Sequence, residues 1–120
     1  MTPLVLLFAA ALQPSPAEPV RAEVCLAHIN VMIADAMRES GRVAGPSWLI
    51  RDWWRERVPG DGQSGALTPE QRAALEQAII ERRARDPEGH GVELGACVDE
   101  AIDAGAVPGM ARVAPEQAPG

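Results

Sequence analysis

The chain has 120 residues, of which 17 are acidic and 11 are arginine, with no lysine, so its formal net charge is −6. This acidic balance, without a basic stripe, argues against nucleic acid as a partner, because phosphate binding needs clustered positive charge. The length fits one small domain, and the apolar spacing is helical almost throughout, with no alternating strand pattern.

Residues 1–17 have the features of a secretory signal. The apolar run from Leu4 to Leu12 is nine residues long, which suits a signal peptide and is too short for a membrane span of about 20 residues. Small residues allow cleavage after Ala17 or after Ala11. No cysteine follows the run, so a lipoprotein leader is not expected. We therefore expect a periplasmic or secreted protein.

The first predicted helix covers residues 20–40. Its apolar residues recur in steps of three and four, as on one face of a helix; they are Ala22, Cys25, Leu26, Ile29, Met32, Ile33, Ala36 and Met37. Gly41 is a natural stop, because glycine adopts the left-handed conformation that ends many helices. A turn around Gly45–Pro46 leads into a tryptophan-rich segment, and a glycine-rich loop covers residues 59–66.

All three tryptophans lie within residues 48–54, and the only Phe, Phe8, lies in the leader. Successive residues of a helix are about 100° apart, which divides residues 48–58 into an apolar and a charged half. The apolar half consists of Leu49, Ile50, Trp53, Trp54 and Val58, with Arg57 as its single charge. We expect Trp53 and Trp54 to be the largest pieces of the core.

Trp48 falls on the charged half of this helix, beside Asp52 and Arg51. Its ring either covers the preceding turn or stacks on Arg51, or it is an exposed anchor for a partner protein, an apolar ligand or a bilayer interface. The mixed charge of its flanks argues against membrane-surface contact. Trp48, Arg51 and Arg55 are the candidate interaction surface, and the expected partner is another periplasmic or secreted protein.

The next predicted helix begins at Thr68. Thr68 is a good N-cap, Pro69 suits the first helical position, and Gln71 stands where the second residue of a capping box is expected. Arginines at positions 82, 83 and 85 suit the carboxyl end of the helix, where the helix dipole favours positive charge.

The last predicted helix follows a cap at Asp86–Pro87. Gly89 and Gly91 weaken its start, so we expect a firm helix only near Val92. Its apolar stripe is Leu94, Cys97, Val98, Ala101 and Ile102. Residues 106–120 are rich in Ala, Pro and Gly, which predicts a disordered tail.

The two cysteines, Cys25 and Cys97, lie on the apolar stripes of the first and last helices. An even number of cysteines in a small exported domain indicates a disulfide, and two cysteines allow one intramolecular pairing. Closing a loop of this length stabilises the folded state by about 4 kcal/mol in the chain-entropy model. We predict a Cys25–Cys97 bridge that joins the two ends of the domain.

Residues 67–71 read LTPEQ and resemble the LTxxQ motif of periplasmic stress chaperones of the Spy/CpxP type, which are small, exported and helical. The match covers five residues and occurs once, whereas that family typically carries the motif twice on a basic surface. The resemblance implies a chaperone or stress-response function. A capping box explains Thr68 and Gln71 without common ancestry.

Few residues are candidates for catalysis or metal binding. The only histidines are His28 and His90, and no HExxH, GxSxG or phosphate-loop pattern occurs. With Cys25 engaged in the disulfide, we expect His28 to be partly exposed and His90 to be solvated between two glycines. Asp99 and Asp103 lie one helical turn apart, as a cation-binding or acid–base pair would. No loop of oxygen ligands accompanies them, so a solvated face is expected.

We therefore predict one all-α domain at residues 18–105, a bundle of three to four helices closed by the Cys25–Cys97 disulfide. The predicted function is non-enzymatic, a protein-interaction module without cofactor, metal or catalytic residues. A stress chaperone of the LTxxQ type is the first alternative. The second is a small hydrolase or metal-binding protein, which would need a pocket around His28 or around Asp99 and Asp103.

Overall fold

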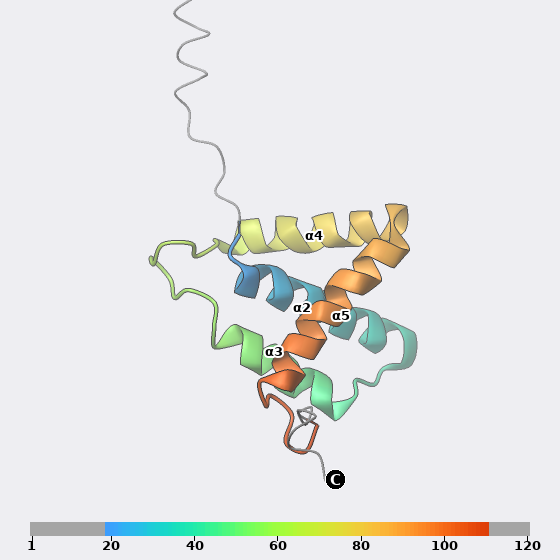
Figure 1. Cartoon of the computed structure of the whole chain (residues 1–120). Helices are drawn as coiled ribbons and strands as arrows, with labels where there is room; N and C mark the ends of the chain where they lie inside the picture. Colours follow the sequence, from blue (N-terminus) through green and yellow to red (C-terminus); the bar gives the residue numbers. More distant parts are fainter. Residues whose placement is uncertain (1–18, 111–120) are drawn as a thin grey trace, which may run out of the picture.

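The computed structural model describes residues 19–110, and within this range it contains four α-helices and no strand (Figure 1). The helices are α2 (Arg21–Ser40), α3 (Gly45–Arg55), α4 (Pro69–Arg85) and α5 (Pro87–Asp103). The predicted all-α bundle is therefore confirmed. The predicted signal at residues 1–17 and the part of the predicted tail at residues 111–120 lie outside the described residues.

Helix α2 is the centre of the bundle, because the other three helices all pack against it, while α3 and α4 do not contact each other within residues 19–110. In Figure 1, α4 and α3 lie on opposite sides of α2, and α5 crosses it. The structure therefore buries more of α2 than the predicted stripe. The additional buried residues are Glu23, Ala27, His28 and Val31. Met37, at the far end of the stripe, is 49% exposed.

Two predicted helix ends are confirmed. Gly41 follows α2 with φ 69°, and its N–H donates to the Met37 carbonyl oxygen at 2.9 Å, which is the left-handed cap expected of glycine. At the start of α4, Thr68 Oγ1 accepts from the Gln71 N–H at 3.1 Å, and Gln71 Oε1 accepts from the Thr68 N–H at 2.8 Å. These two bonds form the predicted capping box.

The start of α5 differs from the prediction, because the helix begins at Pro87 and not near Val92. The Asp86 side chain accepts from the Gly89 N–H at 3.0 Å and so caps the helix. A Cβ atom at Gly89 would clash with the Asp86 carboxylate. The glycine that was expected to weaken this helix start therefore makes room for its cap.

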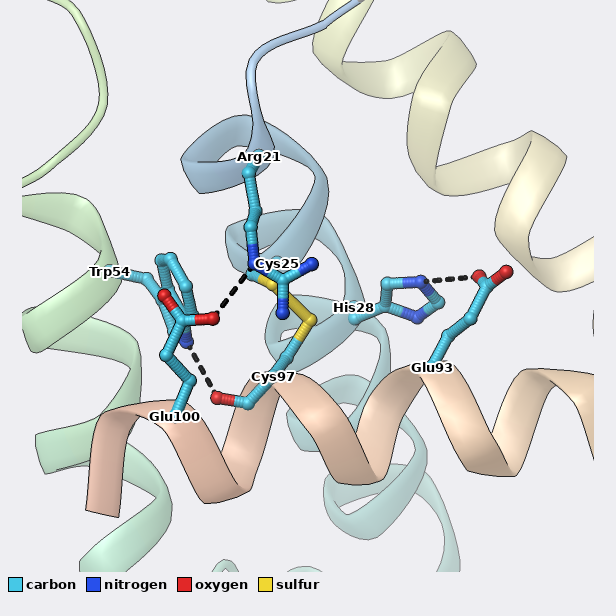
Figure 2. The surroundings of a disulfide bond; sticks show 7 residues. All are labelled: Arg21, Cys25, His28, Trp54, Glu93, Cys97 and Glu100. Carbon is cyan, nitrogen blue, oxygen red and sulfur yellow. Dashed lines mark hydrogen bonds and ion pairs between the residues drawn. A yellow bond between two sulfur atoms is a disulfide. The ribbon is translucent and has the colours of Figure 1, made fainter. Parts of the chain in front are cut away.

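The predicted disulfide joins α2 to α5, with the Cα atoms of Cys25 and Cys97 5.4 Å apart. Around it lies a cluster that we call the disulfide core, which consists of Ala22, Cys25, Leu26, Ile29, Ile33, Ile50, Trp54, Cys97, Ala101 and Val107. Trp54 is 2% exposed, and its Nε1–H donates to the Cys97 carbonyl oxygen at 3.0 Å (Figure 2). Val107 is 5% exposed, so the core includes residues beyond the predicted boundary at 105.

A second, smaller cluster lies between α2 and α4. It consists of Ala27, Val31 and Ile79, with Leu75 and Ile80 packed against them, and we call it the α4 seam. Ile79 is the only buried residue of α4. Three ion pairs also attach this helix, namely Arg72–Glu23, Arg82–Glu93 and Arg83–Asp35. Helix α4 is therefore held to the bundle largely by polar contacts.

Candidate functional site

The candidate interaction residues lie on α3, where the structure leaves two large apolar side chains exposed. Trp48 is 37% exposed and Leu49 is 43% exposed. Leu49 belongs to the apolar half of the helical wheel but is not buried. The buried face of α3 is narrow and centred on Ile50 and Trp54, and Leu49 is about 100° away from Ile50 around the helix.

Arginines surround the exposed tryptophan. The Arg51 guanidinium lies over the Trp48 ring, 4.8 Å from its centroid, so of the predicted arrangements the stacking on Arg51 is observed. Asp52 Oδ1 is 3.0 Å from Nη2 of Arg51 and 3.9 Å from Nη1 of Arg55. One carboxylate is thus shared by two guanidinium groups. We call Trp48, Leu49, Arg51 and Arg55 the α3 surface.

The other two tryptophans differ from each other in burial. Trp54 is in the disulfide core, as predicted, whereas Trp53 is only partly buried and packs against that core from outside. Their rings meet edge to face with centroids 4.8 Å apart. The outer side of Trp53 is covered by Arg57, whose guanidinium carbon is 3.5 Å from the ring centroid and whose Nη1 donates to the Trp53 carbonyl oxygen at 2.7 Å.

Both predictions about the histidines are wrong. His28 is 2% exposed and His90 is 8% exposed. Their rings lie together between α2 and α5, with centroids 5.4 Å apart. His28 is buried because α5 covers this side of α2, and His90 is buried because α5 already begins at Pro87.

The two histidines belong to a group of four ionisable side chains. His28 Nε2 is 3.3 Å from Oε2 of Glu93 on α5 (Figure 2), and Arg82 on α4 pairs with the other oxygen of Glu93. We call His28, His90, Glu93 and Arg82 the histidine cluster. Burial lowers the pKa of His28 below its ordinary value of 6.5; His90 and Arg82 lower it further, and Glu93 partly offsets them.

A signal for the histidine cluster is present in the sequence, but it becomes readable only once the disulfide is placed. His28 follows Cys25 by three residues, so both share one face of α2. Glu93 and His90 precede Cys97 by four and seven residues, which places them on the cysteine's face of α5. A bridge between two helices that run in opposite directions therefore brings His28 next to Glu93.

A cavity of about 430 Å³ opens beside the histidine cluster. It is lined by Arg21, Val24, His28, Arg82, Val92, Glu93, Ala96 and Cys97. Its charged rim is internally paired, because Arg21 Nε is 2.8 Å from Glu100 Oε1 and Arg82 pairs with Glu93. An anion bound here would have to compete with the protein's own carboxylates.

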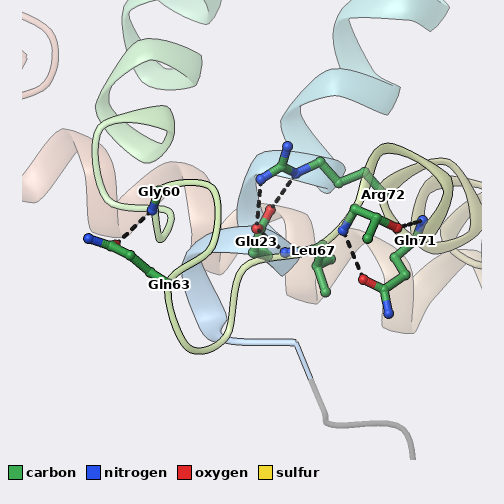
Figure 3. A network of polar contacts seen from close by, with 7 residues as sticks. Glu23, Gly60, Gln63, Leu67, Gln71 and Arg72 are labelled. Carbon is green, nitrogen blue, oxygen red and sulfur yellow. Dashed lines mark hydrogen bonds and ion pairs between the residues drawn. The ribbon is translucent and has the colours of Figure 1, made fainter.

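The LTPEQ segment has a structural role in the bundle, and Figure 3 shows Leu67 and the following Arg72 beside Glu23. Thr68 and Gln71 are engaged with each other in the capping box. The N–H of Leu67 donates to Glu23 Oε2 at 3.2 Å, and the next residue after the motif, Arg72, donates from Nε and Nη2 to both Glu23 oxygens at 3.1 and 3.0 Å. The hydrogen bond to Glu23 raises the pKa of Arg72. The motif thus anchors the amino end of α4 on α2.

The acidic residues of α5 do not form a metal centre. Glu100, between Asp99 and Asp103, pairs with Arg21 on α2. Among residues 19–110, no group of three or more His, Cys, Asp or Glu side chains is placed to hold a metal ion. The helices described here include none that is long and apolar enough to cross a membrane.

Comparison with protein-family models, with curated proteins and with solved structures gave no match for this chain.

Proposed function

We propose that this protein is an exported interaction module that binds another periplasmic or secreted protein through the α3 surface. Export is supported by the apolar segment at residues 4–12 and by the disulfide, because such bonds persist in oxidising compartments. A non-enzymatic role fits the internal ion pairs that occupy the charged rim of the cavity beside His28, Arg21 with Glu100 and Arg82 with Glu93.

One observation carries the proposal. In a chain whose other two tryptophans pack in or against the core, Trp48 remains 37% exposed beside the exposed Leu49. Tryptophan and arginine are the residues most enriched at the energetic centres of protein interfaces. Arg51 holds the Trp48 ring from one side, so little side-chain freedom is lost when a partner covers the ring.

The charge of α3 adds a preference for the partner. Arg51 and Arg55 share the single carboxylate of Asp52, so this face is less acidic than the chain as a whole, whose net charge is −6. Opposite charges across an interface increase the association rate. A partner with an apolar pocket bordered by acidic residues fits this surface.

The proposal is tested by affinity capture from the exported fraction of the producing cells, followed by binding measurements with the purified captured protein. We expect a stoichiometric complex that Trp48→Ala weakens by about tenfold or more. The matched control is Val92→Ala, because Val92 is an apolar side chain of α5 that is 70% exposed and lies outside the α3 surface.

Two results would contradict the proposal. Equal affinity of the wild type and Trp48→Ala would place the binding site elsewhere. Suppression of aggregation of unrelated proteins, without any stoichiometric partner, would favour the LTxxQ-type chaperone instead.

A further inference from the structure

The two histidines of the chain occupy a position where a positive charge is hard to accommodate. They are 62 positions apart in the sequence, and helix packing brings their rings to a centroid distance of 5.4 Å with both largely hidden from water. Neither ring nitrogen of His28 has an aligned hydrogen-bond partner, nor does Nδ1 of His90. Buried polar groups are usually hydrogen-bonded. The two rings therefore destabilise the folded state, and a charge on either ring destabilises it further.

The groups that face His28 come from two other helices. From α5 they are His90 and Glu93, and from α4 the facing group is Arg82. Glu93 is the only negative charge among them, and it is already paired with Arg82. Arg21, on α2 itself, lines the adjacent cavity and is paired with Glu100. A proton on His28 therefore adds positive charge to a group whose one carboxylate is shared.

We propose that the histidine cluster is an acid-sensitive latch, and that protonation of His28 releases α4 and the first half of α5 from α2. When the helices separate, water solvates the protonated imidazole of His28, which is desolvated while it is buried. The added charge is attracted by Glu93 but repelled by His90 and Arg82. Glu93 contacts His28 on α2 and Arg82 on α4, so α2, α4 and α5 meet at this residue.

The direction of the pH effect follows from the pKa of His28, which burial and its neighbours hold below 6.5. We call the bundle with α4 packed on α2 the closed state and the bundle with α4 released the open state. At a pH between the lowered pKa of His28 in the closed state and its ordinary pKa in the open state, the closed state binds fewer protons than the open state. The closed state therefore loses stability as the pH falls below about 6.5, and it is fully stable at higher pH.

The opening is local, because the disulfide limits it. Cys97 is bonded to Cys25 on α2, and the Trp54 ring also binds the Cys97 carbonyl oxygen. His90 and Glu93 precede this fixed point along α5, whereas the part of α5 that contributes Ala101 to the disulfide core follows it. Helix α4 contributes a single buried residue, Ile79, and is otherwise attached to α2 largely by ion pairs, so the bundle can open on this side while α2, α3 and the second half of α5 stay together.

The latch is tested by NMR and by hydrogen exchange on the full chain between pH 7.5 and 5.0. This window includes the ordinary titration of histidine, near pH 6.5, and lies above that of glutamate, near pH 4.3. With only two histidines in the chain, each ring signal is assigned by one variant. We expect His28 to titrate below 6.5, and we expect the protection factors of α4 amides to fall severalfold on acidification while those of the Trp54 and Ala101 amides do not change.

Protection factors are the appropriate measure, because they remove the intrinsic pH dependence of amide exchange. The double variant His28→Phe with His90→Phe keeps two rings but cannot be charged, so its α4 protection should not depend on pH in this window. Glu100→Gln is the matched carboxylate control: it removes an ion pair on the other side of the disulfide and should leave the wild-type pH profile unchanged. Glu93→Gln should increase the acid response, since it removes the charge that partly offsets a protonated His28.

Three outcomes would overturn the latch. The first is titration of His28 at or above 6.5, which the wild type alone reports even if the double variant does not fold. The second is equal loss of protection in α4 and at Trp54 and Ala101, which would mean global unfolding. The third is a folded double variant with the same acid response as the wild type.

Discussion

Helix α2 is held on its two sides by different physical means. On the side of α3 and α5, the disulfide core combines a covalent bond, the buried Trp54 ring and a set of apolar residues. On the side of α4, the seam contributes few buried apolar residues, of which Ile79 is the only one from α4. Polar contacts add to this attachment, namely the ion pairs Arg72–Glu23 and Arg83–Asp35 and the hydrogen bond from Asn30 to Glu76. Apolar burial does not depend on pH or salt to the degree that ion pairs do. The disulfide core, on the side of α3 and α5, is thus a fixed platform, whereas the attachment of α4 can respond to pH and salt.

The largest effect is expected on the platform. Trp54→Ala should lower the free energy of unfolding by about 3–5 kcal/mol, because it leaves a large cavity and removes a hydrogen bond to Cys97. Urea denaturation under oxidising conditions measures this loss. Trp53→Ala is the comparison, and it should cost less, because Trp53 packs against the core from outside. A larger loss for Trp53→Ala than for Trp54→Ala would contradict the assigned positions of the two rings.

An intermediate effect is expected at the amino end of α4. Arg72→Ala leaves the Glu23 carboxylate, which is 2% exposed, without its guanidinium partner, and breaking a buried pair in this way costs about 3 kcal/mol. The control is Arg83→Ala: its partner Asp35 has a side chain that is 21% exposed, against 1% for Glu23, so this pair should contribute less than about 1 kcal/mol.

Hydrogen exchange shows which helix loses protection in the Arg72→Ala and Arg83→Ala variants, in addition to how much stability each variant loses. Arg72→Ala should lower the protection factors of the α4 amides more than the protection factor of the Trp54 amide. If Arg72→Ala and Arg83→Ala had equal effects, burial of Glu23 would not control the attachment of α4.

The smallest effect on stability is expected at the α3 surface. Trp48→Ala should change the free energy of unfolding by no more than about 0.5 kcal/mol. The reason is that Trp48 is 37% exposed and its ring stacks on the Arg51 guanidinium at the surface. Denaturation of the two variants Trp48→Ala and Trp53→Ala, measured side by side, checks this. A larger loss for Trp48→Ala would mean that this ring supports the fold and does not serve as a binding anchor.

Local chemistry determined much of the fold from the sequence. The stop at Gly41 and the capping box at Thr68 and Gln71 depend on residues a few positions apart, so they can be read without knowing the fold. The pairing of Cys25 with Cys97 followed from their even number together with the expected export of a small domain. The position of Trp54 in the core followed from helical periodicity.

Tertiary packing decided what periodicity could not. A hydrophobic stripe predicts one buried face, but α2 is covered on several sides, and this placed His28 and Glu23 inside the bundle. Leu49 lies in the apolar half of the helical wheel and is nevertheless exposed, because the width of a buried face depends on the neighbouring helix. The sequence by itself determined the helical fold class, the stop at Gly41, the capping box of α4 and the pairing of the two cysteines. Only the arrangement of the helices brought His28, His90, Glu93 and Arg82 together, because burial and charge proximity are properties of contacts between distant segments.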